Sequence, residues 1–221
     1  MLNVMIKITK GHEPAEWSAV CSTPGMTYED APKDSLRSAL LQEQGGLCAY
    51  CMRRIKYTKG ESTITRIEHV KPRALSLAEG KSYETLAYDN MVLCCDGDID
   101  GNGTFHCDRS KKDQIISFKP FDQTVMDTIS YSSNKGTIKS SNKDYDSDFN
   151  KILNLNHPKL EISRLAVIKG LVTELGRKKI WKKRDLIDKL NYYSTPKANG
   201  KFHEYCGVII WYLNKKLRQI R

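Results

Sequence analysis

The stretch from Cys48 to Lys111 decides the fold. It contains the segments Cys48-Ala-Tyr-Cys51, Ile67-Glu68-His69-Val70-Lys71-Pro72, Tyr88-Asp89-Asn90-Met91-Val92-Leu93-Cys94-Cys95 and His106-Cys107-Asp108-Arg109-Ser110-Lys111. Five of the seven cysteines and two of the five histidines lie within it. Side-chain packing alone does not require such a density of metal-ligating residue types. We therefore expect the functional centre of the protein in this stretch.

The cysteines indicate a structural zinc site. Cys48 and Cys51 are separated by two residues, so a tight turn can direct both sulfurs at one ion. Zinc needs four ligands, and Cys94 with Cys107 can supply the second pair. Cys95 competes with Cys94, because neighbouring residues of a strand face opposite sides, and we expect Cys94 to be the ligand. A redox role for the Cys-Ala-Tyr-Cys segment is the weaker alternative, since no βαβ pattern surrounds it.

The dipeptide Glu68-His69 offers two of the groups that phosphodiester hydrolysis requires. A carboxylate can hold a divalent cation, and an imidazole can take a proton from water. The segment 64–72 reads as a strand that Pro72 ends, and in an ideal strand the two side chains would face opposite sides. Joint action therefore requires the strand to twist, bulge or end here. A strand-end histidine beside a solvated glutamate is the structural alternative.

The next two segments predict a hairpin and a helix. Residues 88–93 read as a turn and a strand that pairs with 64–70, and Asn90 is expected to bond the backbone of the loop. Residues 107–118 read as a helix with Ile115, Ile116 and Phe118 turned inward. Asp108, in the first turn of that helix, can then reach the same cation as Glu68.

These segments resemble the motif of the HNH endonucleases: Cys-x-x-Cys, Glu-His-Val-x-Pro, Asp-Asn-Met-Val-Leu-Cys and Cys-Asp-x-x-Lys. The family has a ββα-metal core, in which a hairpin and a helix clasp one catalytic divalent ion. The resemblance implies that His69 is the general base. It also implies that Glu68 and Asp108 are the metal ligands, at positions that the family usually fills with Asp and with Asn or His. Both residues keep oxygen ligands, which suit Mg²⁺ or Mn²⁺.

A narrower resemblance covers most of the chain, with gaps. The segments 36–55, 67–73 and 152–156, together with Arg164, are similar to the HNH subunit of Septu-type anti-phage systems. The same type of subunit accompanies some retrons. The resemblance implies an ATPase partner subunit that controls the nuclease and, in a retron, a reverse transcriptase beside it.

Composition favours a polyanionic partner. Lys and Arg number 36 against 26 Asp and Glu, which gives a net charge of +10. Such a field attracts phosphate backbones, although a ribosome-bound or membrane-surface protein could show the same balance. Mean hydropathy is −0.54 and no apolar run approaches the roughly 20 residues of a membrane span, so we expect a soluble, cytoplasmic protein without a membrane partner. The basic residues expected to contact phosphates, unless they only form a solvated face, are Lys71, Arg73, Arg109, Lys111 and Lys112.

Other features leave alternatives open. The acidic loop 96–100 resembles the opening of a calcium loop, but Cys107 stands at the twelfth position, so a solvated loop or a partner contact is favoured. His106 is either a metal or phosphate contact or a loop histidine beside a zinc ligand. Cys21 and Cys206 stand apart and are expected to be small buried residues.

The whole chain is predicted to be α+β. Residues 1–47 read as a strand and helices that pack on the core, with a helix running from Asp34 to Gly45-Gly46. Residues 48–119 are expected to form the nuclease core, and 148–221 a helical region. Residues 120–147 are expected to form a hairpin with its turn at Asn134-Lys135-Gly136, followed by a polar linker over 140–148. The basic runs at 177–184 and 215–218 are either DNA contacts or solvated helix faces.

The sequence thus predicts an enzyme that hydrolyses phosphodiester bonds in DNA, with structural zinc and catalytic Mg²⁺ or Mn²⁺. Two alternatives remain at this stage. One is a zinc-stabilised module that binds nucleic acid, or a scaffold subunit, without catalysis. The other is a nuclease that acts on RNA or tRNA.

Overall fold

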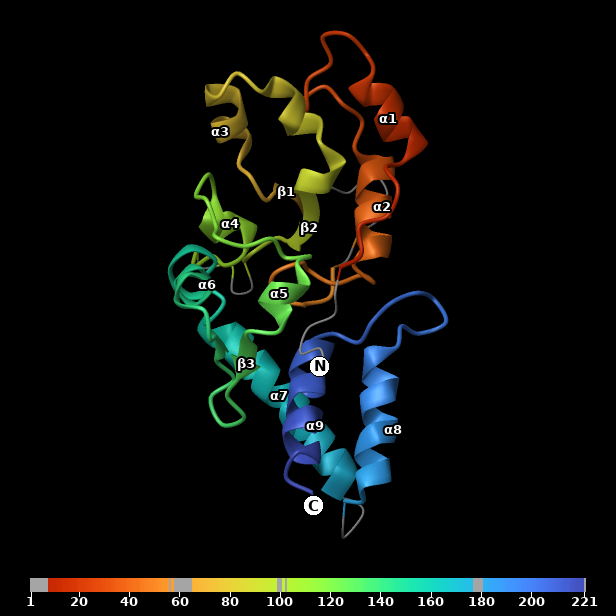
Figure 1. Ribbon diagram of the computed structural model, residues 1–221, viewed down its shortest axis with the longest axis vertical. Coiled ribbons are helices and arrows are strands. Elements are labelled where there is room, and N and C mark those ends of the chain that lie inside the picture. Colours follow the sequence, from red (N-terminus) through yellow and green to blue (C-terminus); the bar gives the residue numbers. More distant parts are fainter. Residues whose placement is uncertain are drawn as a thin grey trace.

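The fold is α+β, with small antiparallel sheets and helices at both ends of the molecule (Figure 1). It is known from a computed structural model that describes residues 8–55, 57, 65–98, 101, 103–176 and 181–220. The N-terminal helices and the first sheet lie at one end, and the C-terminal helices lie at the other. The strand predicted for residues 1–8 lies mostly outside the described residues, as does the basic run 177–180.

Two helices precede the cysteine-rich stretch. In α1, Ala15–Cys21, the fully buried Trp17 donates a hydrogen bond from its indole nitrogen to the carbonyl oxygen of Leu86, at 2.9 Å. The second helix, α2, Asp34–Glu43, buries Leu36 and Leu40. It ends before Gly45 and Gly46, whose positive φ angles of 55° and 74° suit glycine. This helix end was predicted correctly.

The N-terminal prediction needs two corrections. Asp34 does not cap α2 with its side chain; it is the first helical residue, and its carboxylate accepts a hydrogen bond from the hydroxyl of Tyr57, at 2.8 Å. Cys21 is exposed rather than buried, because it stands at the C-terminal end of α1, where its sulfur lies 3.6 Å from the carbonyl oxygen of Leu86. Cys206 is buried, as predicted.

The first sheet is the predicted hairpin of β1, Thr65–His69, and β2, Met91–Cys95. The strands are antiparallel, with Glu68 opposite Val92 and Arg66 opposite Cys94. Pro72 follows β1, and proline cannot donate to a strand ladder. The long connection between the strands contains α3, Arg73–Ala78, η1, Ser82–Leu86, and η2, Tyr88–Asn90.

The helix after Cys107 is much shorter than predicted. It is the single turn α4, Asp108–Lys111, and the chain leaves it at Lys112, whose φ is 53°. Ile115 is therefore 62% exposed instead of facing inward, while Ile116 and Phe118 are buried as expected. The chain turns away because residues 116–118 pack elsewhere: the backbone N–H of Ser117 donates to the carboxylate of Asp148, at 2.7 Å.

The middle of the chain contains the predicted hairpin. After α5, Gln123–Met126, the strands β3, Ile129–Tyr131, and β4, Ile138–Ser140, pair antiparallel. The expected polar linker at 140–148 is instead helical, since α6, Lys143–Ser147, runs into η3, Asp148–Ile152. The side chain of Asn142 accepts hydrogen bonds from the first turn of α6, and this cap starts the helix.

Three longer helices form the C-terminal part: α7, Pro158–Gly176, α8, Lys183–Ser194, and α9, Cys206–Leu217. They lie at the opposite end of the molecule from β1 and β2 (Figure 1), and α9 buries most of its residues from 206 to 214. Among the described residues, no helix combines the length and the apolar character that a membrane crossing needs.

Truncation of Leu40 tests this packing. Leu40 is fully buried on α2, which packs against β2, so Leu40→Ala should lower the free energy of unfolding by about 2–5 kcal/mol. The matched control is Leu77→Ala, at a leucine that is 57% exposed, which should change it by less than about 0.5 kcal/mol. Urea denaturation followed by circular dichroism measures both. Equal losses would contradict the described core.

Candidate functional site

Four buried cysteines form one cluster. The sulfurs of Cys48, Cys51, Cys95 and Cys107 all lie within 4.8 Å of one another. The four cysteines come from three segments. Cys48 and Cys51 flank the turn after α2, Cys95 ends β2, and Cys107 immediately precedes α4 with a φ of 56°. The cluster therefore joins three segments that are distant in sequence.

The geometry of the cluster fits a tetrahedral metal. The sulfurs of Cys48 and Cys107 are 3.8 Å apart, and those of Cys51 and Cys95 are also 3.8 Å apart. A disulfide would require about 2.05 Å. Four thiolates at about 2.3 Å from one zinc ion stand about 3.8 Å from each other at the corners of a tetrahedron. The four cysteines could thus bind a metal such as zinc.

The choice of Cys94 as the fourth ligand is wrong in this geometry, because Cys95 takes that place. Neighbouring residues of β2 face opposite sides, and Cys94 shares its side with Glu68. The Cys94 sulfur lies beside that of Cys48 but outside the group of four. Burial, with Cys48 and then Glu68 nearby, raises the pKa of the Cys94 thiol, which favours its neutral form.

His106 lies directly against this cluster. Its Nδ1 is 3.1 Å from the sulfur of Cys107, and its ring is 5.7 Å from that of His157. Burial lowers the pKa of His106 to about 4, so the ring is neutral at pH 7. Because it is fully buried, His106 cannot reach a phosphate at the surface. Of the acidic loop, Asp98 pairs with Arg109, at 3.3 Å, while residues 99, 100 and 102 lie outside the described part.

A cleft of about 800 Å³ opens beside β1 and α4. Its walls come from β1, from the start of α3, from α4 and from the loop and helix around Lys33 and Arg37. The charged residues that line it are six basic ones and three acidic ones: Lys33, Arg37, Arg66, Arg73, Arg109, Lys112, Glu68, Asp108 and Asp113. The cleft therefore has cationic walls around a small acidic centre.

Glu68 is at the acidic centre and is only 4% exposed. Its Oε1 accepts a hydrogen bond from the Tyr50 hydroxyl, at 3.1 Å, and lies 2.7 Å from the ammonium of Lys111. Burial, with Asp108 within hydrogen-bonding reach, raises the pKa of Glu68 to about 8, although Lys111 opposes the shift. The two carboxylates thus lie close enough to compete for one proton or to share one cation.

The donor set of Glu68 and Asp108 fits a hard divalent cation. Mg²⁺ is commonly bound through one or two carboxylates, with water and substrate phosphate completing its octahedron. Asp108 opens onto the cleft and forms an ion pair with Arg66, which is half exposed. These residues could therefore hold Mg²⁺ or Mn²⁺ where a phosphate enters.

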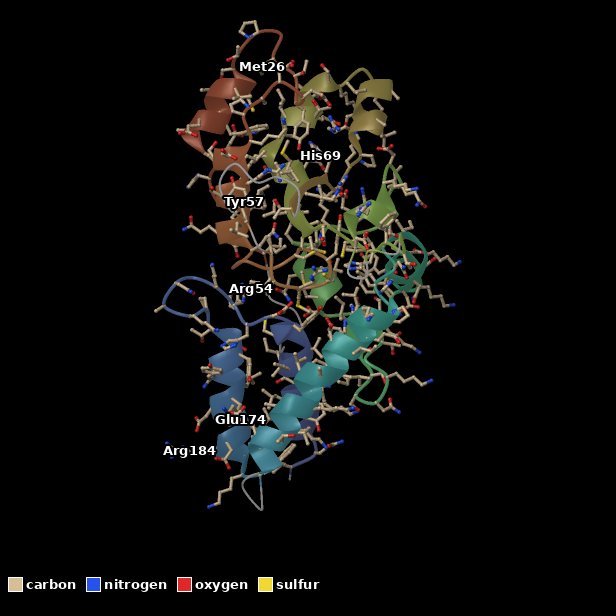
Figure 2. The ribbon with its side chains drawn as sticks, turned by 180° about the vertical axis from the view of Figure 1, so that it is seen from behind. Met26, Arg54, Tyr57, His69, Glu174 and Arg184 are labelled. Carbon is tan, nitrogen blue, oxygen red and sulfur yellow. The ribbon has the colours of Figure 1, made fainter. Side chains whose placement is uncertain are left out.

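His69 lies on the other side of β1 but lines the same cleft. Its Nε2 is 2.9 Å from the carbonyl oxygen of Thr85, and since a carbonyl only accepts, Nε2 carries the proton and Nδ1 is left as an acceptor. The ring of Tyr28 packs edge-on against the imidazole of His69, with 4.7 Å between the ring centres. Burial lowers the pKa of His69 to about 4, so its imidazole is neutral at pH 7. Figure 2 labels His69 in the half of the molecule that holds α1 and α2.

The predicted phosphate contacts divide into two groups. Arg73, Arg109 and Lys112 line the cleft. Lys111 does not: it is fully buried, and its ammonium pairs with Glu68, so this prediction is wrong for the described conformation. Lys71 lies outside the cleft and pairs with Glu79 and Glu84.

Asn90 has a structural position in the hairpin. Its Oδ1 accepts from the backbone N–H of Lys71, at 2.8 Å, and its Nδ2 donates to the carbonyl oxygen of the same residue, at 2.9 Å. These two bonds hold the chain two residues after His69, the last residue of β1. Asn90 therefore orients the loop and does not line the cleft.

Sequence reasoning did not find several residues of the cleft. Tyr28 packs on His69, Tyr50 bonds Glu68, and Arg66 pairs with Asp108. Tyr50 stands inside a quoted motif and Arg66 directly precedes another, and alternation along β1 puts Arg66 on the side of Glu68. Tyr28 carries no such signal, because only tertiary packing brings residues 28 and 69 together.

Comparison with known proteins gives no assignment: no model of a protein family matches this chain, and no curated protein matches it either.

Substitution of each competing cysteine tests the metal cluster. Purified Cys94→Ser should keep about one zinc ion per chain, as the wild type does, whereas Cys95→Ser should lose most of it because one of four ligands is gone. Inductively coupled plasma mass spectrometry measures the zinc content. The cluster is misassigned if Cys94→Ser loses zinc and Cys95→Ser retains it.

Proposed function

We propose that this chain is a metal-dependent nuclease of the HNH type that hydrolyses phosphodiester bonds in DNA. One observation carries the proposal: two adjacent carboxylates, Glu68 and Asp108, and the neutral imidazole of His69 line a single cleft with basic walls. Carboxylates for a divalent cation, a base for water and cations for phosphates are the groups that such hydrolysis needs.

The residues have distinct roles in this proposal. His69 presents an unprotonated Nδ1, held by the Thr85 carbonyl and the ring of Tyr28, and accepts a proton from the attacking water. Glu68 and Asp108 hold Mg²⁺ or Mn²⁺, which when bound stabilises the negative charge that develops on the phosphoryl group. Arg73, Arg109 and Lys112 orient the phosphate backbone from the walls of the cleft.

The order of elements supports an HNH-like core. The antiparallel strands β1 and β2 are followed by α4, which carries Asp108 to the side of Glu68. The four-cysteine cluster includes Cys107, the residue before Asp108, so a bound zinc ion would hold α4 against the hairpin. The proposal extends to Septu-type defence, with an ATPase partner subunit and in a retron a reverse transcriptase; this part rests on the sequence resemblance alone.

Substitution of the general base tests the enzyme. His69→Ala should lower the rate of DNA cleavage in the presence of Mg²⁺ or Mn²⁺ by roughly 10²- to 10⁴-fold, the usual contribution of a positioned base. His12→Ala, at an exposed histidine outside the cleft, is the control and should cleave like the wild type. Gel assays on supercoiled and linear DNA, with and without the ATPase partner, measure both. Wild-type activity in His69→Ala would remove the assigned base.

One observation favours a second candidate function. Both carboxylates have cationic partners, since Glu68 pairs with Lys111 and Asp108 with Arg66. Such pairing also suits a zinc-stabilised module that binds nucleic acid without cutting it. The two candidates differ in whether the acidic centre binds a divalent cation.

Manganese binding separates these candidates. We expect the wild-type protein to bind Mn²⁺ in the absence of nucleic acid, and Asp108→Asn to weaken that binding by at least about tenfold, because a charged oxygen ligand is lost. Asp113→Asn is the matched control, since Asp113 lines the same cleft but is exposed, whereas Asp108 interacts directly with Glu68. Electron paramagnetic resonance of free Mn²⁺ measures the binding. Identical weak binding in all three proteins, with no cleavage of DNA or RNA, would support the non-catalytic module.

A further inference from the structure

A second basic hollow lies far from the catalytic cleft, between α7 and α9. It measures about 420 Å³, and we call it the α7/α9 groove. α7 supplies four residues, α9 supplies three, and the turn between β3 and β4 supplies one. They are Ile168, Lys169, Val172, Thr173, Tyr212, Lys215, Lys216 and Ser133. None of the functions proposed above uses this groove.

The charge of the groove is of one sign. Lys169, Lys215 and Lys216 line it, and within the described part of the chain no carboxylate does. The ion pairs described for the chain include none of these three lysines. By contrast, Lys189 on the neighbouring α8 pairs with Glu174. Among the described residues, the groove therefore carries three charges without an ion-pair partner.

Aromatic rings position two of these charges. The ammonium of Lys215 lies 5.2 Å from the ring centre of Trp211, and that of Lys216 lies 5.6 Å from Tyr212 and 5.9 Å from Trp181. In such contacts the aliphatic part of the lysine packs on the ring and one side of the ammonium faces it. The other N–H groups of the ammonium can still donate to another acceptor. The hydroxyls of Ser133 and Thr173 add neutral donors at the same place. Cations with hydroxyl donors are the contacts that proteins make to phosphate oxygens.

We propose that the α7/α9 groove is a second phosphate-backbone site, which binds the DNA duplex away from the position of cleavage. This inference rests on the proposed function for its ligand class, but it concerns binding and not catalysis. The groove gives affinity and orientation without reading base sequence, since backbone contacts carry no sequence information.

The fold sets the spacing between the groove and the cleft. The backbone N–H of Cys107 donates to the carbonyl oxygen of Leu153, at 2.8 Å, so the chain just before α7 lies beside the start of α4. From Pro158, Lys169 and Thr173 are 11 and 15 residues along α7, or roughly 17 and 23 Å at about 1.5 Å per residue. α7 runs away from α4 in Figure 1. At about 3.4 Å of duplex axis per base pair, the length of α7 from Pro158 to these two residues corresponds to about five to seven base pairs.

A charge-matched pair of variants tests the groove. The triple variant Lys169→Gln, Lys215→Gln and Lys216→Gln removes its three charges. The control, Lys183→Gln, Lys197→Gln and Lys201→Gln, removes three exposed lysines of α8 and the following loop, outside the groove. Fluorescence anisotropy with a labelled 24-base-pair duplex, without added divalent cation, measures Kd between 50 and 200 mM salt. Circular dichroism checks that both variants are folded.

The expected results are specific to the groove. The groove variant should bind the duplex roughly tenfold more weakly or worse, and the slope of log K against log salt should fall by about 2 to 3, because each lost phosphate contact contributes about 0.9. The control should keep the wild-type slope. Wild-type affinity and slope in the groove variant, or an equal loss in both variants, would overturn the proposal.

Acetylation gives an independent reading on the wild-type chain. Lys169, Lys215 and Lys216 should react more slowly with acetic anhydride when the duplex is bound, while Lys183 and Lys197 should react at an unchanged rate, as followed by peptide mass spectrometry. Protection of these three lysines in a protein that never cuts DNA would uphold the groove and refute the nuclease. Cleavage of DNA without protection of these lysines would uphold the nuclease and refute the groove.

Discussion

The four-cysteine cluster is the constraint on which the rest of the structure depends. It ties the turn after α2, the end of β2 and the start of α4 to one point, beside the short β1–β2 sheet and the one-turn helix α4. A helix of four residues has no stability of its own, because helix nucleation is unfavourable and needs tertiary packing. Metal binding at the cluster would supply that stability as folding free energy. The position of Asp108 then follows from that of Cys107.

The buried pair of Glu68 and Lys111 is the second constraint. Removing two charges from water is costly, and their attraction offsets this only when further hydrogen bonds satisfy both groups. Tyr50 supplies one such bond to Glu68, at 3.1 Å, and the carbonyl oxygen of His69 accepts another from Lys111, at 3.2 Å. The pair therefore fixes geometry more than it adds stability: it links the last residue of α4 to both candidate catalytic residues of β1.

The sequence predicted those features that local pattern controls. β-Branched residues before Pro72 located β1, and a short apolar run after a turn located β2. Glycine located the end of α2, and the Asn134-Lys135-Gly136 turn located the β3–β4 hairpin. It failed where tertiary contacts decide. Lys112 ends α4 early because residues 116–118 pack against η3, and Cys95 replaces Cys94 because Cys94 faces the side of the hairpin that carries Glu68. Burial of Lys111 could not be predicted either, since a lysine next to a nucleic-acid motif is ordinarily solvent-exposed.

The distribution of charge relates the two ends of the molecule. A net charge of +10 would attract a polyanion wherever the lysines stood. The described basic residues of the cleft have carboxylates among them, whereas those of the groove do not. In the cleft, basic side chains surround two carboxylates that have cationic partners, and under the proposed function a metal ion would replace those partners. In the α7/α9 groove no described carboxylate is present, and the proposed role of that region is binding. A long helix, α7, separates them by a fixed distance, and a stiff duplex that fills both must therefore meet the cleft in one orientation.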